Sequence, residues 1–231
     1  MPYVLKRHEG DFIYSGSYIN GHAYYEYNNS GDGDDPRVYN GRFEYHGRYK
    51  SSHEGQRVHD EISGYYKNDL KNGRWTFIRK GKGIYKELKV DYTDGTPNGM
   101  YTYYAKGLSV NKFQIHMTIE MHNGHPTGKI KGRLKDSSFN GQCDTDGCPD
   151  GLWLFKIFSD KNITYYELWD HGILNDSYSI SISTGKKHAV PEKIRSIIKE
   201  IVCYDSMPLE KIIRKGAHVW DGDITVIRNG E

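Results

Sequence analysis

The sequence predicts an all-β protein, an elongated antiparallel β-meander of hairpin repeats with a short C-terminal helical cap. Three observations predict this fold class: a turn phrase that recurs five times, strands in which apolar and polar residues alternate, and large side chains at fixed offsets after each turn. The composition agrees, because the 231 residues include 26 glycines and 20 tyrosines but only 36% hydrophobic residues. Such a chain suits a thin sheet with half-exposed aromatics better than a thick core.

Each turn phrase has an anchor position, which is glycine in four copies and aspartate in the fifth. The residues before the anchor are mostly Asn, Asp, His, Gly and Pro, which favour turns because Gly and Asn tolerate positive φ and Pro fixes φ. Successive anchors are 26, 29, 23 and 25 residues apart, and a near-constant spacing of this size indicates an array of similar units. The anchors are Gly73, Gly99, Gly128, Gly151 and Asp176.

The segments that enter the turns alternate with a period of two, as strands with one covered face and one wet face do. In residues 84–92 only Lys86 interrupts the apolar side, and in residues 113–121 that side is continuous. We therefore expect residues 11–182 to form a meander with almost no helix. Large residues two positions after the anchors should form a ladder on one face, with Ile130 as its weak member. These residues are Trp75, Tyr101, Ile130, Trp153 and Tyr178.

The beginning of the chain carries a related pattern. Residues 14–21 read Tyr-x-Gly-x-aromatic-x-x-Gly, and residues 39–43 and 62–66 repeat part of it. This pattern resembles the opening of a MORN repeat (membrane occupation and recognition nexus). The run from Gly64 to Phe77 is similar to the MORN-like variant of many bacterial proteins, some of which are antitoxin components.

The resemblance spans residues 11 to 182 and implies a single-layer β-meander used for protein or membrane-lipid contact, without catalytic residues. The sequence departs from the family's pattern in three ways. The repeat lengths vary, Asp176 replaces the anchor glycine, and Ile130 stands where an aromatic residue is expected.

After Gly185 the pattern changes. Apolar residues at positions i, i+3, i+4, i+7 and i+8 predict an amphipathic helix over 191–203, with Pro191 near its first turn. A second, shorter helix over 206–216 and a strand or hairpin over 219–227 are expected to follow. The apolar residues of the first helix are Ile194, Ile197, Ile198, Ile201 and Val202.

Exposed isoleucine stripes promote aggregation, so the first helix is expected to pack on the last repeats. Residues 1–185 are accordingly interpreted as the repeat array and residues 186–231 as its cap. The alternative interpretation is a short, separate effector domain.

Two groups of possible metal ligands lie in or near the turns. Asp144, Asp146 and Asp150 resemble the start of a calcium loop, but the bidentate glutamate at its twelfth position is missing. Asp150 also aligns with turn-forming residues of the other copies, which favours a repeated turn. Cys143 and Cys148 flank this turn as two free thiols, a disulfide, or half of a zinc site that lacks two ligands, and free thiols are the preferred interpretation.

A third group, His116, Glu120 and His122, shares one strand face, but its outer members lie too far apart along the strand to share an ion. We therefore expect no metal and no cofactor. The chain has no nucleophile elbow, phosphate loop or dinucleotide fingerprint, so an enzyme is not expected.

Charge and hydropathy limit the partners. Lys and Arg total 32 and Asp and Glu total 30, so no global field recruits nucleic acid. The basic clusters at 79–82 and 129–133 are interpreted as solvated strand faces. No segment approaches the ~20 apolar residues of a membrane span, and the N-terminus lacks a signal-peptide core, so a cytoplasmic location is expected.

These observations predict a non-catalytic scaffold for protein–protein interaction, with membrane lipid as a second kind of partner. Rigid aromatic rows are favourable for binding because Trp and Tyr are enriched at interface hot spots. The alternatives are a ligand- or glycan-binding module and an enzyme built on the C-terminal segment or across an oligomer. The predicted binding residues are Trp75, Tyr101, Tyr103, Trp153 and Trp169.

Overall fold

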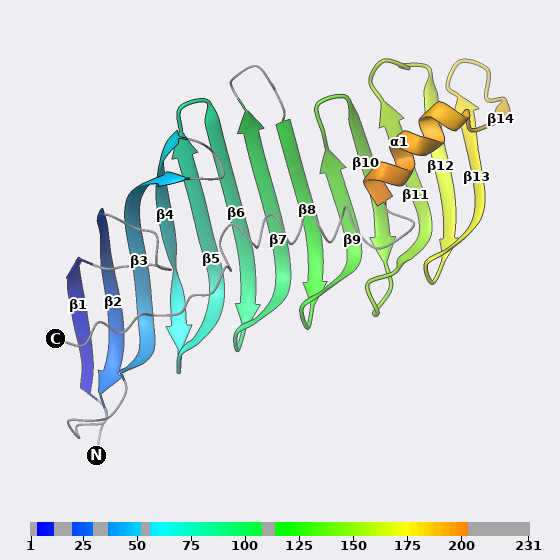
Figure 1. Cartoon of the computed structure of the whole chain (residues 1–231). Helices are drawn as coiled ribbons and strands as arrows, with labels where there is room; N and C mark the ends of the chain where they lie inside the picture. The colour runs from blue at the N-terminus through cyan, green and yellow to red at the C-terminus, as the bar shows by residue number, and fades with distance from the viewer. Residues whose placement is uncertain (1–3, 12–19, 30–36, 52–55, 108–113, 203–231) are drawn as a thin grey trace. The chain divides into compact units, whose positions relative to one another are not determined.

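The computed structural model describes residues 4–11, 20–29, 37–51, 56–107 and 114–202. Fourteen strands follow one another in the sheet in chain order, with one short helix after them (Figure 1). The predicted all-β meander is therefore confirmed. The elements are β1 (Val4–Asp11), β2 (Asn20–Asn29), β3 (Val38–Ser51), β4 (Gln56–Lys67), β5 (Leu70–Gly81), β6 (Ile84–Thr93), β7 (Thr96–Gly107), β8 (Gln114–His122), β9 (His125–Arg133), β10 (Ser137–Cys143), β11 (Pro149–Ile157), β12 (Ile163–Asp170), β13 (Ile173–Ser181), β14 (Lys187–Ala189) and α1 (Glu192–Val202).

The described chain divides into two compact units at β7. Residues up to 99 and residues 105–107 belong to the N-terminal unit, and residues 100–104 and 114–202 belong to the C-terminal unit. Strands β1 to β6 pair in sequence within the first unit, and β8 to β14 do so within the second. Each unit is described on its own below.

The turn phrases form tight hairpin turns, as predicted. Four turns have positive φ at both central residues, which is the conformation of a type I′ turn and matches the right-handed twist of the flanking strands. The fifth turn, at 144–148, is wider. There the backbone N–H groups of Asp146 and Cys148 each donate to Asp144 Oδ1 at 2.9 Å. The four tight turns have Asn68–Asp69, Asp94–Gly95, Asn123–Gly124 and His171–Gly172 at their centres.

The anchor glycines mark a second irregularity, a bulge in the strand that leaves each turn. Ser63 and Tyr65 are two residues apart, but their partners Thr76 and Asn72 are four apart, so β5 carries two extra residues near Gly73. The same count applies in three other hairpins, including β2–β3, whose bulge contains Gly41. Glycine suits these positions because their φ is positive. The glycines concerned are Gly41, Gly73, Gly128 and Gly151.

The last hairpin differs, and it corrects one part of the predicted ladder. Leu168 and Trp169 are adjacent, while their partners Asp176 and Leu174 are two apart, so this bulge contains one extra residue instead of two. Asp176 does not adopt positive φ. A shift of one residue moves every side chain to the other face. Tyr178 therefore lies opposite Tyr166, on the face away from Trp153, and the prediction that Tyr178 joins the ladder is wrong.

The other ladder residues are buried: Trp75, Tyr101, Ile130 and Trp153. Two of them use the same packing device. Trp75 covers Gly64 of the preceding strand, and Trp153 covers Gly141 in the same way, so that a Cβ atom at either glycine would overlap the indole ring.

Each indole N–H then donates to the carbonyl of the residue after that glycine, Trp75 to Tyr65 and Trp153 to Gln142, at 3.0 Å in both cases. A phenylalanine of an earlier strand stacks on each indole: Phe43 of β3 stacks on Trp75, and Phe139 of β10 stacks on Trp153. The tryptophan–glycine contact and the indole hydrogen bond are thus the same in both units.

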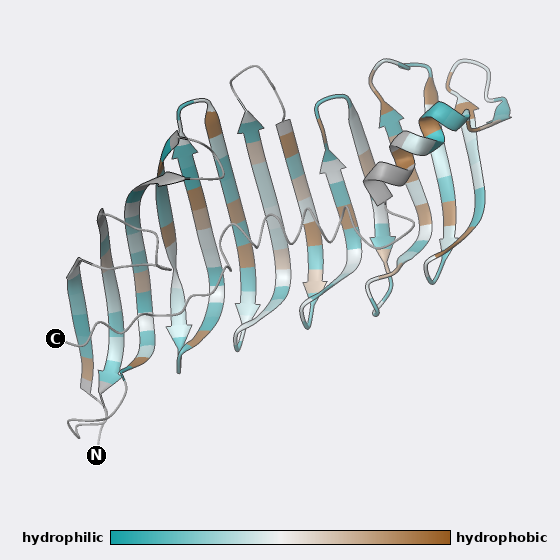
Figure 2. Ribbon diagram, viewed as in Figure 1, coloured by the Kyte–Doolittle hydropathy of each residue, from teal (hydrophilic) through white to brown (hydrophobic). Residues whose placement is uncertain are grey.

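Apolar and polar residues alternate along the strands, as Figure 2 shows by alternating brown and teal bands. In each unit we call the face that carries the buried residues the buried face and the other the exposed face. As predicted, the apolar side of residues 84–92 is buried: Ile84, Leu88, Val90 and Tyr92. Of the residues predicted for the apolar side of 113–121, Met117, Ile119 and Met121 are buried, and Phe113 lies outside the described residues.

The buried face of the N-terminal unit also holds an ion pair. Arg79 on β5 donates to both carboxylate oxygens of Asp60 on β4, at 2.8 and 2.7 Å, and the two side chains are 6% and 1% exposed. The interpretation of residues 79–82 as a solvated basic cluster is therefore wrong for Arg79. Its guanidinium lies inside because Asp60 is its direct cross-strand partner.

At the C-terminal end the predicted helix is present as α1, drawn across β10 to β12 in Figure 1. Val190 just before the helix and Ile198 within it are buried. The sheet continues to β14, which lies within the segment interpreted as the cap. The predicted helix over 206–216 and the strand over 219–227 lie outside the described residues. No helix among the described residues is long and apolar enough to span a membrane.

Candidate functional site

The five aromatic residues predicted to bind a partner are all buried, and none exposes more than 8% of its surface. Trp169 donates its indole N–H to Glu167, a buried glutamate, at 3.1 Å, and Trp75 and Trp153 donate to backbone carbonyls. These rings pack the sheet, and a partner that approaches the exposed face meets other residues. The five are Trp75, Tyr101, Tyr103, Trp153 and Trp169.

The exposed face of the C-terminal unit carries a group of apolar side chains on three neighbouring strands. Cross-strand pairing joins them directly, because Leu152 faces Leu168, Leu154 faces Tyr166, and Tyr166 faces Tyr178. We call this group the apolar patch. It contains Leu152, Leu154, Tyr166, Leu168 and Tyr178.

The two leucines at one end of the patch are solvent-exposed, Leu152 by 44% and Leu168 by 42%. Beside them the rings of Tyr166 and Tyr178 stack with centroids 5.1 Å apart and an interplanar angle of 12°. The sheet backbone holds all four side chains in fixed positions. Tyr178 joins the patch because the single-residue bulge in β13 turns it toward this face.

A row of basic residues on β9 lies on the same face. The cross-strand pairs place Lys131 opposite Asn140, which faces Leu154 of the patch, so one strand of polar residues separates the basic row from the patch. Lys187 closes the other side, with its Nζ 3.8 Å from the Tyr178 ring centroid and 3.1 Å from Asp176 Oδ2. The basic row consists of Lys129, Lys131 and Arg133, all exposed.

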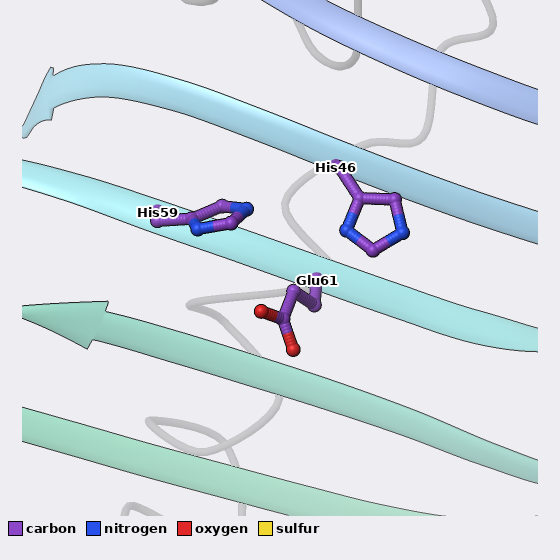
Figure 3. A group of neighbouring side chains, drawn as sticks. All are labelled: His46, His59 and Glu61. Atoms are coloured by element: carbon purple, nitrogen blue, oxygen red, sulfur yellow. The ribbon is translucent and has the colours of Figure 1, made fainter.

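The exposed face of the N-terminal unit brings together two histidines and a glutamate, which we call the histidine cluster. His46 on β3 directly faces Glu61 on β4, and His59 lies two residues before Glu61 on the same face. One nitrogen from each ring and one carboxylate oxygen all lie within 4.8 Å of one another (Figure 3). In the part of the chain that the structure describes, this is the one group of His, Cys, Asp and Glu side chains with metal-site geometry.

Two cations lie next to the histidine cluster. Lys80 Nζ donates to Glu61 Oε1 at 2.7 Å, and this hydrogen bond is the main cause that lowers the pKa of Glu61. Arg48 is the direct cross-strand partner of His59. Partial burial lowers the pKa of His59, and the charges of Arg48 and Lys80 act in the same direction against Glu61. The His59 ring is therefore predominantly neutral at neutral pH.

Neither the apolar patch nor the histidine cluster was predicted from the sequence. His46 and His59 are 13 residues apart and meet only through the pairing register of β3 and β4. The leucine pair of the patch depends on the pairing register of β11 and β12, and the place of Tyr178 depends on the reduced bulge at Asp176, for which the missing anchor glycine was the available signal.

Of the candidate calcium ligands, Asp144 stabilises its own turn. Asp144 Oδ1 accepts two backbone N–H groups, and Asp144 Oδ2 lies 2.9 Å from His171 Nδ1.

Cys143 and Cys148 are free thiols. Burial raises the pKa of Cys143 to about 12 and also raises that of Cys148, so both thiols are protonated and poor nucleophiles at neutral pH. His116, Glu120 and His122 do not converge with metal-site geometry.

A scan against models of known protein families finds no match, and a search of curated proteins finds no relative.

Proposed function

We propose that this protein is a non-catalytic scaffold that binds a protein partner through the apolar patch on β11, β12 and β13. The observation that carries the proposal is the exposed cross-strand pair of Leu152 and Leu168 beside the stacked Tyr166 and Tyr178. Apolar residues held on a rigid sheet lose little conformational entropy on binding, which favours their use as an interface core. The MORN resemblance, with its implied role in protein contact, points the same way.

The surroundings of the patch specify the chemistry of the partner. Strand β10 separates the basic row on β9 from β11. Lys156 on β11 faces Ser138 on β10, which in turn faces Arg133 on β9, so Lys156 lies on the same face as the basic row. A complementary partner therefore offers an apolar segment flanked by acidic residues. Opposite charges at the rim of an interface accelerate association and fix the binding register.

The alternative, a glycan-binding module, needs exposed rings side by side in one plane. Tyr166 and Tyr178 instead stack face to face, so each ring covers one face of the other. This arrangement favours the protein-binding proposal.

The test compares the proteins captured from a lysate of the source organism by three forms of the purified chain. They are the wild type, the double variant Leu152→Asn/Leu168→Asn, and the control Ile182→Asn. Ile182 is 62% exposed and lies outside the patch, so the control removes an exposed apolar side chain without touching the proposed interface.

The proposal expects a partner that the wild type and the control retain and the double variant loses. Titration of that purified partner should then show at least a tenfold weaker affinity for the double variant, because exposed interface leucines contribute about 1–2 kcal/mol each when covered. Equal capture by all three forms would exclude the patch. Equal binding of all three to anionic lipid vesicles, with no protein captured, would favour the lipid alternative instead.

A further inference from the structure

We propose that His46, His59 and Glu61 form a binding site for one zinc-like divalent transition-metal ion on the exposed face of the N-terminal unit. Two imidazoles and one carboxylate suit zinc and its neighbours in the first transition series, whereas calcium and magnesium prefer all-oxygen sites. The site lies on β3 and β4 and involves none of the residues of the apolar patch. The inference is therefore independent of the proposed partner binding.

The backbone holds the three ligands on one side of two paired strands. His46 and Glu61 are directly opposite, and His59 and Glu61 are at positions i and i+2 of one strand, so all three side chains point to the same face. The strands are rigid relative to the side chains, and a site placed on paired strands needs only side-chain rotation to close.

The distances require a small adjustment. The three ligand atoms lie within 4.8 Å of one another. Two ligand atoms on one tetrahedral zinc are roughly 3.4 Å apart, given zinc–ligand distances of about 2.0–2.2 Å. Closure by about 1.4 Å is within reach of χ1 and χ2 rotation of exposed or half-buried side chains. The fourth coordination position faces solvent, where water or a donor atom from another molecule can occupy it.

Two neighbouring cations oppose the bound ion. Lys80 holds Glu61 Oε1 at 2.7 Å and Arg48 faces His59, so the metal must share the carboxylate with a lysine and tolerate a nearby guanidinium. On the next strand His22 directly faces His46, and its Nε2 lies 3.7 Å from Glu9 Oε1. Because Lys80 competes with the metal ion for the Glu61 carboxylate, removing the Lys80 charge should strengthen metal binding. Removing a ligand should have the opposite effect.

The experiment measures zinc binding by isothermal titration calorimetry in a background in which all three cysteines are serine, because thiols bind zinc on their own. Co²⁺ is titrated in parallel, since its visible absorption reports protein nitrogen ligands. The variants are His46→Asn, His59→Asn and Lys80→Met. His116→Asn is the matched control, because His116 is an exposed strand histidine in the other unit.

The proposal expects one zinc ion per chain in the background protein and in the control. His46→Asn and His59→Asn should each weaken binding at least tenfold, and Lys80→Met should strengthen it severalfold. Absence of zinc binding, or equal affinity in both histidine variants and the background, would overturn the proposal. Unchanged affinity for zinc in Lys80→Met would indicate that Glu61 does not bind the metal, which would contradict the proposed site.

Discussion

At the scale of single residues, two ion pairs on the same two strands show how burial determines the effect of an ion pair on stability. Asp60–Arg79 and Glu61–Lys80 are neighbours on β4 and β5. The first pair is almost fully buried and bidentate, and the second is exposed, with side chains 27% and 47% accessible. A buried charge without its partner is costly, whereas an exposed one is solvated by water.

We therefore predict that Asp60→Asn lowers the free energy of unfolding by about 3–5 kcal/mol, because it removes the negative charge that pairs bidentately with the buried Arg79 guanidinium. Replacing both residues with apolar side chains, as in Asp60→Leu/Arg79→Met, should restore much of the loss. The matched control Lys80→Met should change stability by less than about 1 kcal/mol. Urea unfolding of the four proteins measures these differences, and equal losses in Asp60→Asn and Lys80→Met would contradict the prediction.

A second residue-scale prediction concerns the pKa of His171. The hydrogen bond that the His171 ring donates to Asp144 is the main cause that raises this pKa, and the charge of Asp170 adds to it. The same bond lowers the pKa of Asp144. The His171 contribution to stability is therefore fully present below the ordinary histidine pKa and is lost as the pH rises through the raised value. The Asp144 contribution is present above the ordinary carboxyl pKa and is lost as the pH falls through the lowered value.

Asp144→Asn should move the pKa of His171 back toward its ordinary value, while the turn remains capped because the amide oxygen can still accept the N–H groups of Asp146 and Cys148. NMR titration of the ring protons, assigned with His171→Gln, measures the change. Asp170→Asn serves as the comparison and should give a smaller decrease, since its carboxylate lies 3.9 Å from the ring. An unchanged pKa in Asp144→Asn would show that the contact is absent in solution.

At the scale of the strands, the sequence predicted the turns, the alternation and most of the ladder because each depends on neighbours within one hairpin. Trp75, Ile130 and Trp153 follow the predicted alternation and lie on the buried faces of their units. Tyr178 was assigned to the wrong face because one residue fewer in the bulge near Asp176 reverses the alternation. Turn chemistry can be read locally, but the number of residues in a bulge depends on pairing with the other strand.

The packing of tryptophan over glycine leads to a prediction at this scale. Gly141→Ala should destabilise the protein by about 1–3 kcal/mol, because the new methyl group overlaps the Trp153 indole and forces it to move. Gly10→Ala is the control, since the nearest atom to its added Cβ is 3.5 Å away, and it should change stability by less than about 0.5 kcal/mol. Thermal unfolding of both variants would show the difference, and similar melting temperatures would argue against close packing at Gly141.

At the scale of the whole molecule, the fold class was predictable and the candidate sites were not. Strand order follows the chain, so a repeated hairpin phrase is sufficient to specify it. The histidine cluster and the Leu152–Leu168 pair instead depend on the register between strands that are joined by turns or loops, which single-sequence patterns do not specify. The predicted aromatic binding residues are buried instead of exposed, and two of them, Trp75 and Trp153, cover the backbone of a glycine.

The last prediction concerns the C-terminal segment. Deleting residues 189–231 removes Val190 and Ile198, both buried, and should yield aggregated or oligomeric protein because the surfaces that cover them become exposed. Ile198→Asp should act in the same direction, and Arg195→Ala, at an exposed position of α1, should have no effect. Size-exclusion chromatography with light scattering measures the outcome. A truncated chain that stays monomeric with unchanged stability would favour the effector interpretation of this segment.

The order of the strands has a consequence for synthesis. Each strand lies beside the one translated just before it, so contacts are local and no strand has to wait for a distant partner. A repeat of 23–29 residues leaves the ribosome in roughly 1–6 s at about 5–20 residues per second, far longer than the microseconds a hairpin needs to form. The nascent sheet can therefore grow one hairpin at a time, and its newest strand presents an open edge until the next hairpin emerges.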